Sequence, residues 1–232
     1  MRLNQFISSS GFCSRRRADV LIKEQRVTVN GELIKLGHVI REGDRVEVDG
    51  QLIKAKENDI YIMLNKPPGV TCTSASNIEG NIIDFVNYPE RIFPVGRLDK
   101  QSEGLILMTD DGSVVNDLLR EENNQEKDYL VTVNKKITQE FIEAMAAGVE
   151  IYNPRKKGNS LTKPCKVIQL DDDCFKITLS QGLNRQIRRM CRRFQYTVTK
   201  LQRVRMKNIE LGQLELGQWR YLSEEEINGL RK

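Results

Sequence analysis

The chain contains 232 residues with a formal net charge of +5; 39% of them are hydrophobic and 30% are charged. This length suits one large domain, or one medium and one small domain. No apolar run approaches the roughly 20 residues that a membrane-spanning helix needs, and the first residues lack the continuous apolar segment of a signal peptide. The composition therefore argues against a membrane protein, and we expect a cytoplasmic one.

Cysteine and histidine usage excludes several kinds of site. The five cysteines are an odd number, they are widely spaced, and the only histidine is His38. This pattern argues against disulfides, a structural zinc site and catalysis by a Ser–His or Cys–His pair. We expect all five cysteines to be small, buried and reduced side chains, and we expect no bound metal.

The first part of the chain, residues 1–49, has the pattern of a separate small module. A short amphipathic helix comes first, and Ser14 is suited to be the N-cap of a second helix. Two short alternating strands then flank Asn30-Gly31, a dipeptide typical of tight hairpin turns, and the strand RVEVDG closes the module. The short polar stretch 50–59 is expected to be a linker.

Three arginines, Arg15, Arg16 and Arg17, occupy the first turn of the predicted second helix. A helix dipole prefers acidic residues there, so each arginine opposes the dipole by some tenths of a kcal/mol. Folding alone does not favour these arginines, whereas contact with nucleic-acid phosphates does. With this cluster, the sequences RLNQFISSSGFCSRRRAD and VTVNGELI resemble the S4 RNA-binding domain over nearly all of residues 1–49.

The remaining residues, 60–232, are expected to form a larger domain in which strands and helices alternate irregularly. Strands are predicted over IYIMLNK, KDYLVTV, KVIQL, CFKITLS and TVTKLQRVRM, and helices over TQEFIEAMAAG and the C-terminal segment, where Ser223 and Glu226 have capping-box spacing. Residues 153–164 are expected to be a basic loop. Several short connections suit hairpins, so we predict an α+β fold with a mainly antiparallel mixed sheet flanked by helices.

The stretch FPVGRLDKQSEGLILMTDDG places a single acid, Asp99, between Arg97 and Lys100, just before an apolar strand. One interpretation is an ordinary charged turn between two buried strands. The other is a reactive carboxylate with basic neighbours. The pattern of this stretch alone does not separate the two.

A basic helix is predicted from Asn184, with its buried stripe at Ile187, Met190, Cys191 and Phe194. Arg188 lies at the border of that stripe, where it either reaches inward to a carboxylate or lies over the edge of the core. The other arginines of the helix point away from the stripe: Arg185, Arg189, Arg192 and Arg193. Residues 184–207 contain nine Lys or Arg and no Asp or Glu, a local charge that favours nucleic acid as partner.

Three motifs in this order behind an S4-like module, GRLDKQSEGLILMTDDG, EKDYLVTV and QGLNRQIRRM, resemble the bacterial ribosomal pseudouridine synthases of the family that includes the small-subunit synthase A. The resemblance covers almost the whole chain. Ser102 stands where Thr is commoner in the family, and Met108 where Leu is commoner; both changes keep the chemical character. The family often carries a long basic C-terminal tail, which the sequence up to Lys232 lacks, so we expect no contribution of a tail to RNA affinity.

The resemblance implies a role for individual residues. Asp99 would be the catalytic aspartate, Tyr129 would stack on the target base, and Arg188 would be the basic partner of Asp99. Arg97 would help to occupy the space left by the flipped nucleotide. On its strand, Tyr129 alternates with its neighbours as a half-buried residue does, so a core tyrosine is an equal alternative from the pattern alone.

The implied reaction converts uridine to pseudouridine: the N1–C1′ bond breaks, the uracil turns, and C5 joins C1′. It needs an ionised carboxylate and an extruded base and no cofactor. Whether Asp99 removes the C2′ proton or attacks C1′ stays open. The implied substrate is 23S ribosomal RNA or a large-subunit assembly intermediate, with tRNA as a further substrate, and we expect a monomer. The residues expected to bind RNA are Arg2, Arg15, Arg16, Arg17, Arg97, Arg155, Lys156, Lys157, Arg185, Arg189, Arg192 and Arg193.

Two alternatives come from other functional classes. A non-catalytic RNA-binding or ribosome-assembly protein would explain the S4-like module and the basic helix, but not the three motifs together. A glycosidase-like enzyme acting on nucleosides would need two carboxylates placed as acid and base. The sequence frames only one such acid, because Asp110 and Asp111 fit the start of a helix better.

Overall fold

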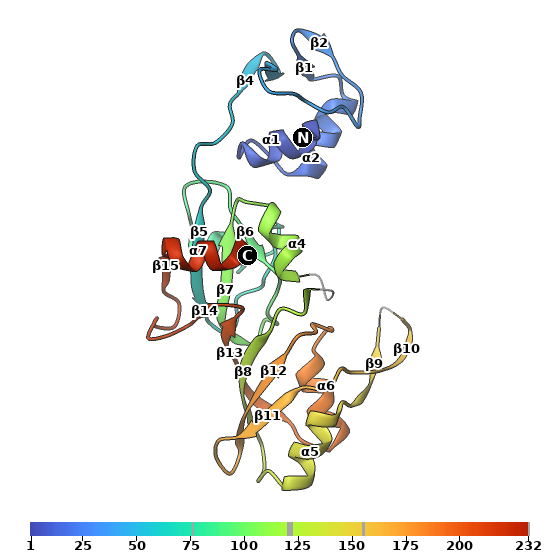
Figure 1. The fold of residues 1–232 in the computed structure, drawn as a ribbon, viewed down its shortest axis with the longest axis vertical. Coiled ribbons are helices and arrows are strands. Elements are labelled where there is room, and N and C mark those ends of the chain that lie inside the picture. The colour runs from blue at the N-terminus through green and yellow to red at the C-terminus, as the bar shows by residue number, and fades with distance from the viewer. Residues whose placement is uncertain (76, 120–122, 155, 232) are drawn as a thin grey trace.

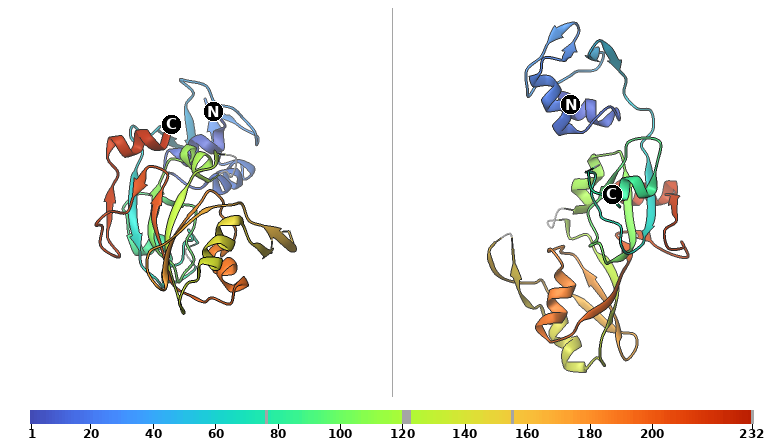
Figure 2. Two further views of the ribbon diagram at one scale, coloured as in Figure 1. Left: turned by 60° about the horizontal axis from the view of Figure 1, so that its bottom comes forward. Right: turned by 180° about the vertical axis from the view of Figure 1, so that it is seen from behind.

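The structure is a computed structural model that describes residues 1–75, 77–119, 123–154 and 156–231. The molecule is elongated, and its N-terminal module lies at one end in both Figure 1 and the view from behind in Figure 2. A central part contains the strands that follow the module, and the far end contains the basic helix.

The N-terminal module packs two helices against a small antiparallel sheet with strand order β2-β1-β3-β4. Its apolar core draws only on residues before the second part of the chain, from Leu3 to Ile53. The elements are α1 (Leu3–Ser9), α2 (Arg15–Lys23), β1 (Val27–Val29), β2 (Glu32–Leu33), β3 (Val46–Val48) and β4 (Gln51–Ile53). Strand β4 lies within the range expected to be a linker, so the sheet of the module continues to Ile53.

Local signals of the sequence account for this module. The Ser14 hydroxyl accepts a hydrogen bond from the Arg17 backbone N–H at 3.2 Å and so caps α2 as predicted. Asn30 and Gly31 both have positive φ, 54° and 83°, which is the backbone of the tight hairpin turn that pairs β1 with β2.

The second part is built on one nine-stranded sheet, in the order β11-β12-β8-β13-β7-β5-β15, with β14 added to β13 and β6 added to β7. All pairs are antiparallel except β13 with β7, which run parallel. The predicted α+β fold with a mainly antiparallel sheet is confirmed. The strands are β5 (Tyr61–Lys66), β6 (Phe93–Val95), β7 (Glu103–Thr109), β8 (Lys127–Val133), β11 (Lys166–Gln169), β12 (Cys174–Leu179), β13 (Val198–Met206), β14 (Ile209–Glu210) and β15 (Trp219–Tyr221).

Helices cover both faces of this sheet, which explains why β5 and β7 are apolar without alternation. Their residues alternate between a core under α4 and α7 and a core under α3; α4 and α7 lie in front of these strands in Figure 1. A third core joins α5 and α6 to β8, β12 and β13. The helices are α3 (Ile82–Val86), α4 (Ser113–Leu119), α5 (Gln139–Ala147), α6 (Gln186–Arg193) and α7 (Glu224–Arg231).

The parallel contact between β7 and β13 joins the two halves of the sheet, and it requires a glycine. Gly104 has φ +102°, and a Cβ at this position would lie 2.3 Å from the carbonyl oxygen of Arg203. Gly104 is therefore required because the backbones of β7 and β13 approach each other closely here, directly behind the loop that carries Asp99.

Two expectations about local structure are wrong: the form of residues 153–164 and the burial of the cysteines. The predicted basic loop at 153–164 is partly a two-stranded hairpin, β9 (Glu150–Asn153) with β10 (Gly158–Leu161), because its alternating residues pair across a turn. All five cysteines are free, but only Cys72 and Cys191 are buried.

Within the described residues, no helix has both the length and the apolar character needed to cross a membrane.

Candidate active site

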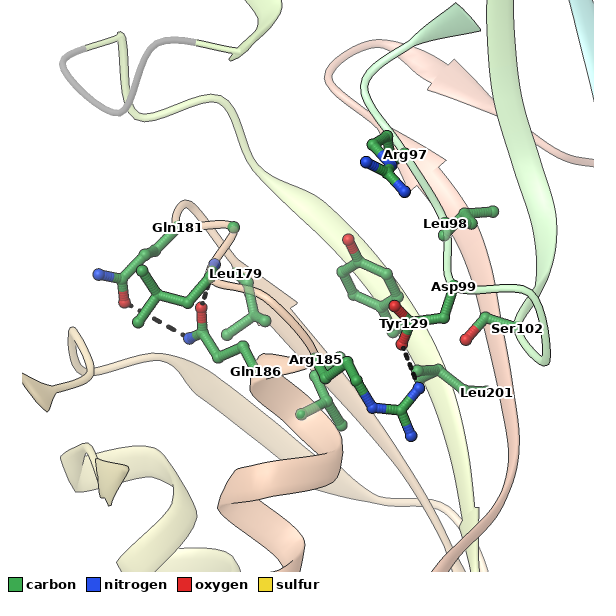
Figure 3. Close-up of a pocket in the computed structure, with 13 residues that line it drawn as sticks. Arg97, Leu98, Asp99, Ser102, Tyr129, Leu179, Gln181, Arg185, Gln186 and Leu201 are labelled. Atoms are coloured by element: carbon green, nitrogen blue, oxygen red, sulfur yellow. Dashed lines mark hydrogen bonds and ion pairs between the residues drawn. The ribbon is translucent and has the colours of Figure 1, made fainter. Parts of the chain in front are cut away.

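A pocket of about 110 Å³ lies where the loop before β7 faces β8 and the start of α6 (Figure 3). It brings together residues that are far apart in the sequence, from all three motifs. The lining residues are Arg97, Leu98, Asp99, Ser102, Tyr129, Leu179, Gln181, Gly182, Leu183, Arg185, Gln186, Ile187 and Leu201.

Asp99 sits on a loop that is held from behind. Its carbonyl accepts a hydrogen bond from the Ser102 N–H at 3.0 Å. The ammonium group of Lys66, a fully buried side chain, donates to the carbonyl of Ser102 at 2.8 Å and lies 3.4 Å from that of Lys100. Burial lowers the pKa of Lys66. The loop is thereby tied to the end of β5, and the Asp99 carboxylate, 26% exposed, points into the pocket.

Lys66 was not identified from the sequence. The only available signal is a lysine that ends an apolar strand immediately before Pro67-Pro68, which is also the ordinary place for a solvated charge. Burial of this ammonium group is favourable only because the loop turns two carbonyls, those of Lys100 and Ser102, toward it beside the adjacent carbonyl of Pro67.

Arg188 lies at the border of the buried stripe of α6, and its side chain is only 12% exposed. Its guanidinium donates to the carbonyl of Val198 at 3.0 Å and to the hydroxyl of Ser102 at 3.3 Å. Its Nε lies 3.8 Å from Oδ2 of Asp99. Burial and the nearby Arg185 lower the pKa of Arg188, and Asp99 opposes this shift. The sequence left open whether Arg188 reaches inward to a carboxylate or lies over the edge of the core. In the structure its side chain reaches inward to Asp99.

Arg185 is a second cation at Asp99. It was expected to point away from the buried stripe of the helix, and it is exposed, but α6 begins at Gln186 rather than at the predicted Asn184. Arg185 is its N-cap in the left-handed region, with φ 51° and ψ 35°. From there its Nη1 reaches Oδ2 of Asp99 at 3.5 Å (Figure 3).

Tyr129 is half-buried on β8 and packs against two cores at once, the one beneath α5 and α6 and the one beneath α3. Its ring stands beside the Asp99 carboxylate in Figure 3, and both residues line the pocket. Because Tyr129 is only partly buried and lines the pocket, part of its ring is available to stack against a flat base.

The other basic residues are distributed over several surfaces. Arg97 is exposed and lines the pocket. Arg189 is half-buried and donates to the carbonyl of Tyr152 at 2.6 Å. Arg155 lies outside the described residues. The remaining candidates are exposed: Arg2, Arg15, Arg16, Arg17, Lys156, Lys157, Arg192 and Arg193. Among these, Arg15 faces the larger domain, since a Cβ added at Gly112 would lie 3.2 Å from its Nη2.

The charge of residues 184–207 suggested one RNA-facing surface, but the basic residues of this run do not all face outward. Arg203 is buried and donates to the carbonyl of Leu105 at 2.7 Å. Arg205 pairs with Asp128 at 2.8 Å, and Lys207 donates to the carbonyl of Leu230 at 3.0 Å. These three cations bind partners within the protein, so most of the charge that faces outward comes from α6 and the residues beside it.

Asp110 and Asp111, the other acids considered for a glycosidase-like site, both have structural partners. Asp111 accepts a hydrogen bond from the Ser113 N–H at 2.8 Å, at the start of α4 as predicted. Asp110 is buried and accepts from the N–H of Ile60 at 2.7 Å. In the part of the chain that the structure describes, no group of three or more His, Cys, Asp or Glu side chains is arranged to hold a metal ion.

Comparison with known proteins gives consistent results. A family model described as RNA pseudouridylate synthase matches residues 60–193, and a model of the S4 domain matches residues 1–46. The chain is 49% identical, over its whole length and 79% of the relative, to the dual-specificity RNA pseudouridine synthase RluF of Escherichia coli strain K12. It is 32% identical to the ribosomal large subunit pseudouridine synthase B of Bacillus subtilis, over 99% of this chain and 95% of that one.

The fold agrees with a solved structure. A protein whose structure is described as a crystal structure of pseudouridylate synthase superimposes with a TM-score of 0.70 and 32% sequence identity, covering 99% of both chains. The match therefore includes the N-terminal module as well as the domain that carries the pocket.

Proposed function

The chain belongs to the family of RNA pseudouridine synthases, and from this premise we propose that it modifies a uridine of large-subunit ribosomal RNA with Asp99 as the catalytic carboxylate. The resemblance of the motifs to the bacterial pseudouridine synthases is confirmed, and the 49% identity to RluF places the chain near the synthases of that type. Membership also excludes the non-catalytic and glycosidase alternatives. We also propose that the chain divides into an S4 domain at 1–49, a linker at 50–59 and a catalytic domain at 60–232. We propose further that the protein is cytoplasmic and monomeric.

The observation that carries the site assignment is the convergence of three motifs on one pocket. Asp99, Tyr129 and Arg188 come from a loop, a strand and a helix that are distant in sequence, yet the first two line the pocket and the third contacts Asp99. A charged turn or a core tyrosine would not require this convergence. At this pocket the Asp99 carboxylate lies 3.5 Å from the guanidinium group of Arg185 and 3.8 Å from Nε of Arg188.

In the mechanism we propose, the target uridine leaves the RNA stack and enters this pocket, where Tyr129 stacks on the base. The guanidinium groups of Arg188 and Arg185 lie beside the Asp99 carboxylate. The carboxylate removes the C2′ proton or attacks C1′, and the N1–C1′ bond breaks. The uracil turns and C5 joins C1′, while the proton returns to C2′ or the bond between Asp99 and C1′ breaks. C5 then gives up its proton with help from the Tyr129 hydroxyl, and N1 gains one. The reaction is an isomerisation and needs no external reactant.

The ribosomal substrate is supported by the relatives. The Bacillus subtilis protein is named as a large-subunit ribosomal synthase, and RluF is named as dual-specificity, which supports a second RNA substrate, such as tRNA, for this chain too. The exposed basic residues of α2 and α6 give the charge that a folded RNA requires.

The test uses RNA carrying tritium at uridine C5, because pseudouridine formation releases this label without cutting the chain. Large-subunit rRNA and tRNA, each prepared from cells lacking the gene, are compared as substrates of the wild-type enzyme and of Asp99→Asn. Asp172→Asn is the matched control, since this carboxylate is exposed in the turn between β11 and β12. We expect release from rRNA by the wild type and the control only. Release from tRNA alone would contradict the ribosomal assignment.

A further inference from the structure

We propose that Arg185 is a phosphate-exchange residue. Its guanidinium group pairs with Asp99 when the pocket holds no RNA. When the target nucleotide enters, the guanidinium group leaves Asp99 and pairs with a phosphodiester of that nucleotide. The inference rests on the proposed role of Asp99 and adds a ligand group, the phosphate next to the target uridine, together with the residue that binds it.

The two arginines at Asp99 differ in how they are anchored. Arg188 has two hydrogen bonds to other parts of the protein, to the Val198 carbonyl at 3.0 Å and to Ser102 at 3.3 Å. Among the described residues, Arg185 has one side-chain partner, Asp99, at 3.5 Å. Its side chain is 44% exposed, against 12% for Arg188. Arg188 is thus a fixed counter-charge, whereas Arg185 is bound by a single long contact and is able to leave.

Electrostatics favours such an exchange. Both guanidinium groups approach the same oxygen, Oδ2 of Asp99. The positive charge of Arg185 is one cause of the lowered pKa of Arg188, so the two cations repel each other across one anion. A second anion at the mouth of the pocket relieves that repulsion. A phosphodiester suits this place because its oxygens accept hydrogen bonds from the forked guanidinium.

The backbone holds Arg185 at the mouth of the pocket. The residue has a left-handed conformation that costs energy for a side chain with a Cβ. The side chain of Gln186 helps to maintain it, because its Oε1 accepts a hydrogen bond from the Leu183 N–H at 3.0 Å. In Figure 3 the Arg185 side chain extends from the start of α6 toward Asp99 instead of along the helix. Strain of this kind is expected where a side chain must be aimed.

The exchange has a functional consequence. Asp99 keeps one fixed partner, Arg188, and loses the second only when a phosphorylated nucleotide is in place. The carboxylate therefore becomes accessible to the ribose in the presence of RNA and is shielded in its absence. A nucleoside without phosphates would leave Arg185 on Asp99.

The experiment compares the affinities of uridine and uridine 3′,5′-bisphosphate for the full-length protein by NMR titration. The wild type is expected to prefer the bisphosphate by about tenfold or more, the range of a charge-assisted hydrogen bond. Arg185→Gln should lose this preference, and Arg185→Lys should keep part of it. The matched control is Arg41→Gln, an exposed arginine of the N-terminal module that does not line the pocket, and it should keep the full preference.

A second readout reports the exchange itself. Carboxyl ¹³C NMR follows the signal of the Asp99 carboxylate, which should move when the wild type binds the bisphosphate, because one counter-charge leaves and an anion arrives. The signal should move less with uridine, and it should also move less in Arg185→Gln. Equal bisphosphate preference in Arg185→Gln and wild type, or a wild type without preference, would overturn the proposal. Failure of the ribosomal assignment would instead appear as absent tritium release from rRNA, which these titrations do not depend on.

Discussion

Asp128 and Tyr129 are adjacent on β8, yet they lie on opposite faces of the sheet and in opposite kinds of surroundings. Asp128 is 3% exposed and accepts hydrogen bonds from Arg205 at 2.8 and 2.9 Å and from Thr178 at 2.8 Å, with Lys176 also at 2.8 Å. On the other face, beside Tyr129, the nearest cations to Asp99 are 3.5 and 3.8 Å away. One carboxylate is saturated with partners and the other is not.

This difference separates a structural carboxylate from a reactive one. Burial alone would raise the pKa of Asp128, but the hydrogen bonds from Arg205, Lys176 and Thr178 outweigh it and hold the pKa well below its usual range. All of its lone pairs are engaged, so none is available to a substrate. Asp99 has long contacts at one oxygen and an open pocket in front. Charge without saturation is what a base or a nucleophile requires.

The largest effect on activity should come from Asp99→Asn. The neutral isostere keeps the shape of the side chain but is neither a base nor a nucleophile, so turnover should fall by at least about 10²-fold. RNA affinity should stay within a few-fold, and the free energy of unfolding should hardly change. Single-turnover tritium release and a binding titration check these values. Activity above about a hundredth of wild type would remove Asp99 from the mechanism.

The largest effect on stability should come from Asp128→Asn, which removes the counter-charge of Lys176 and leaves Arg205 with Glu126 as its acidic partner. We expect the free energy of unfolding to fall by about 3 kcal/mol, with near-normal activity at temperatures where the variant is folded. Urea unfolding with an unchanged m-value checks this loss. A stable but inactive variant would contradict the division of roles between the two carboxylates.

The same residue predicts a pH dependence of stability. The pKa of Asp128 is lower in the folded state than the unfolded value of about 3.9. Its contribution is therefore fully present above about pH 4 to 5 and is lost as the pH falls through the folded pKa. Unfolding free energies measured between about pH 5 and pH 2 should fall more steeply for wild type than for Asp128→Asn. Parallel curves would show that the network does not depress this pKa.

A smaller effect on activity is expected from Arg188→Met, which keeps the packing of the stem and removes the fixed counter-charge of Asp99. Turnover, measured by single-turnover tritium release, should fall about 10- to 100-fold. Arg188→Lys should be intermediate, since it keeps the charge and loses the fork. Combined with Asp99→Asn, Arg188→Met should cost almost nothing more; multiplying losses would mean that the two residues act separately.

The smallest effect concerns the arginines of α2. Arg16 and Arg17 are exposed, whereas Arg15 faces Gly112. Changing Arg16 and Arg17 to Ala should lower the slope of log K against log salt by about 0.7–0.9 for each RNA phosphate that the variant no longer binds. Arg15→Ala should leave that slope unchanged, and turnover at saturating RNA should change little in every case. An equal decrease of the slope in Arg15→Ala would place all three arginines on the RNA.

Much of the fold and part of the site were predictable because their signals are local. The Ser14 cap, the Asn30-Gly31 turn and the capping box of α7 follow from backbone preferences of a few residues. In that box, Ser223 and Glu226 each accept the other's backbone N–H, at 3.2 and 2.8 Å. Tyr129 and Arg188 were selected through the resemblance of their motifs to a known family. The periods of a strand and a helix indicated only that Tyr129 is half-buried and that Arg188 lies at the border of the buried stripe.

The positions of the long charged side chains could not be predicted in this way. Arg185, Lys66 and Arg203 each occur in a sequence context that suits a solvated charge, yet their partners lie on elements distant along the chain. Arg185 changed its role because the helix begins one residue after it, a shift smaller than a pattern resolves. Local patterns are enough to specify which elements form and which of their faces are apolar. The choice among distant partners depends on the packing of the whole sheet, because a flexible cation pairs with whichever oxygen the fold brings within reach.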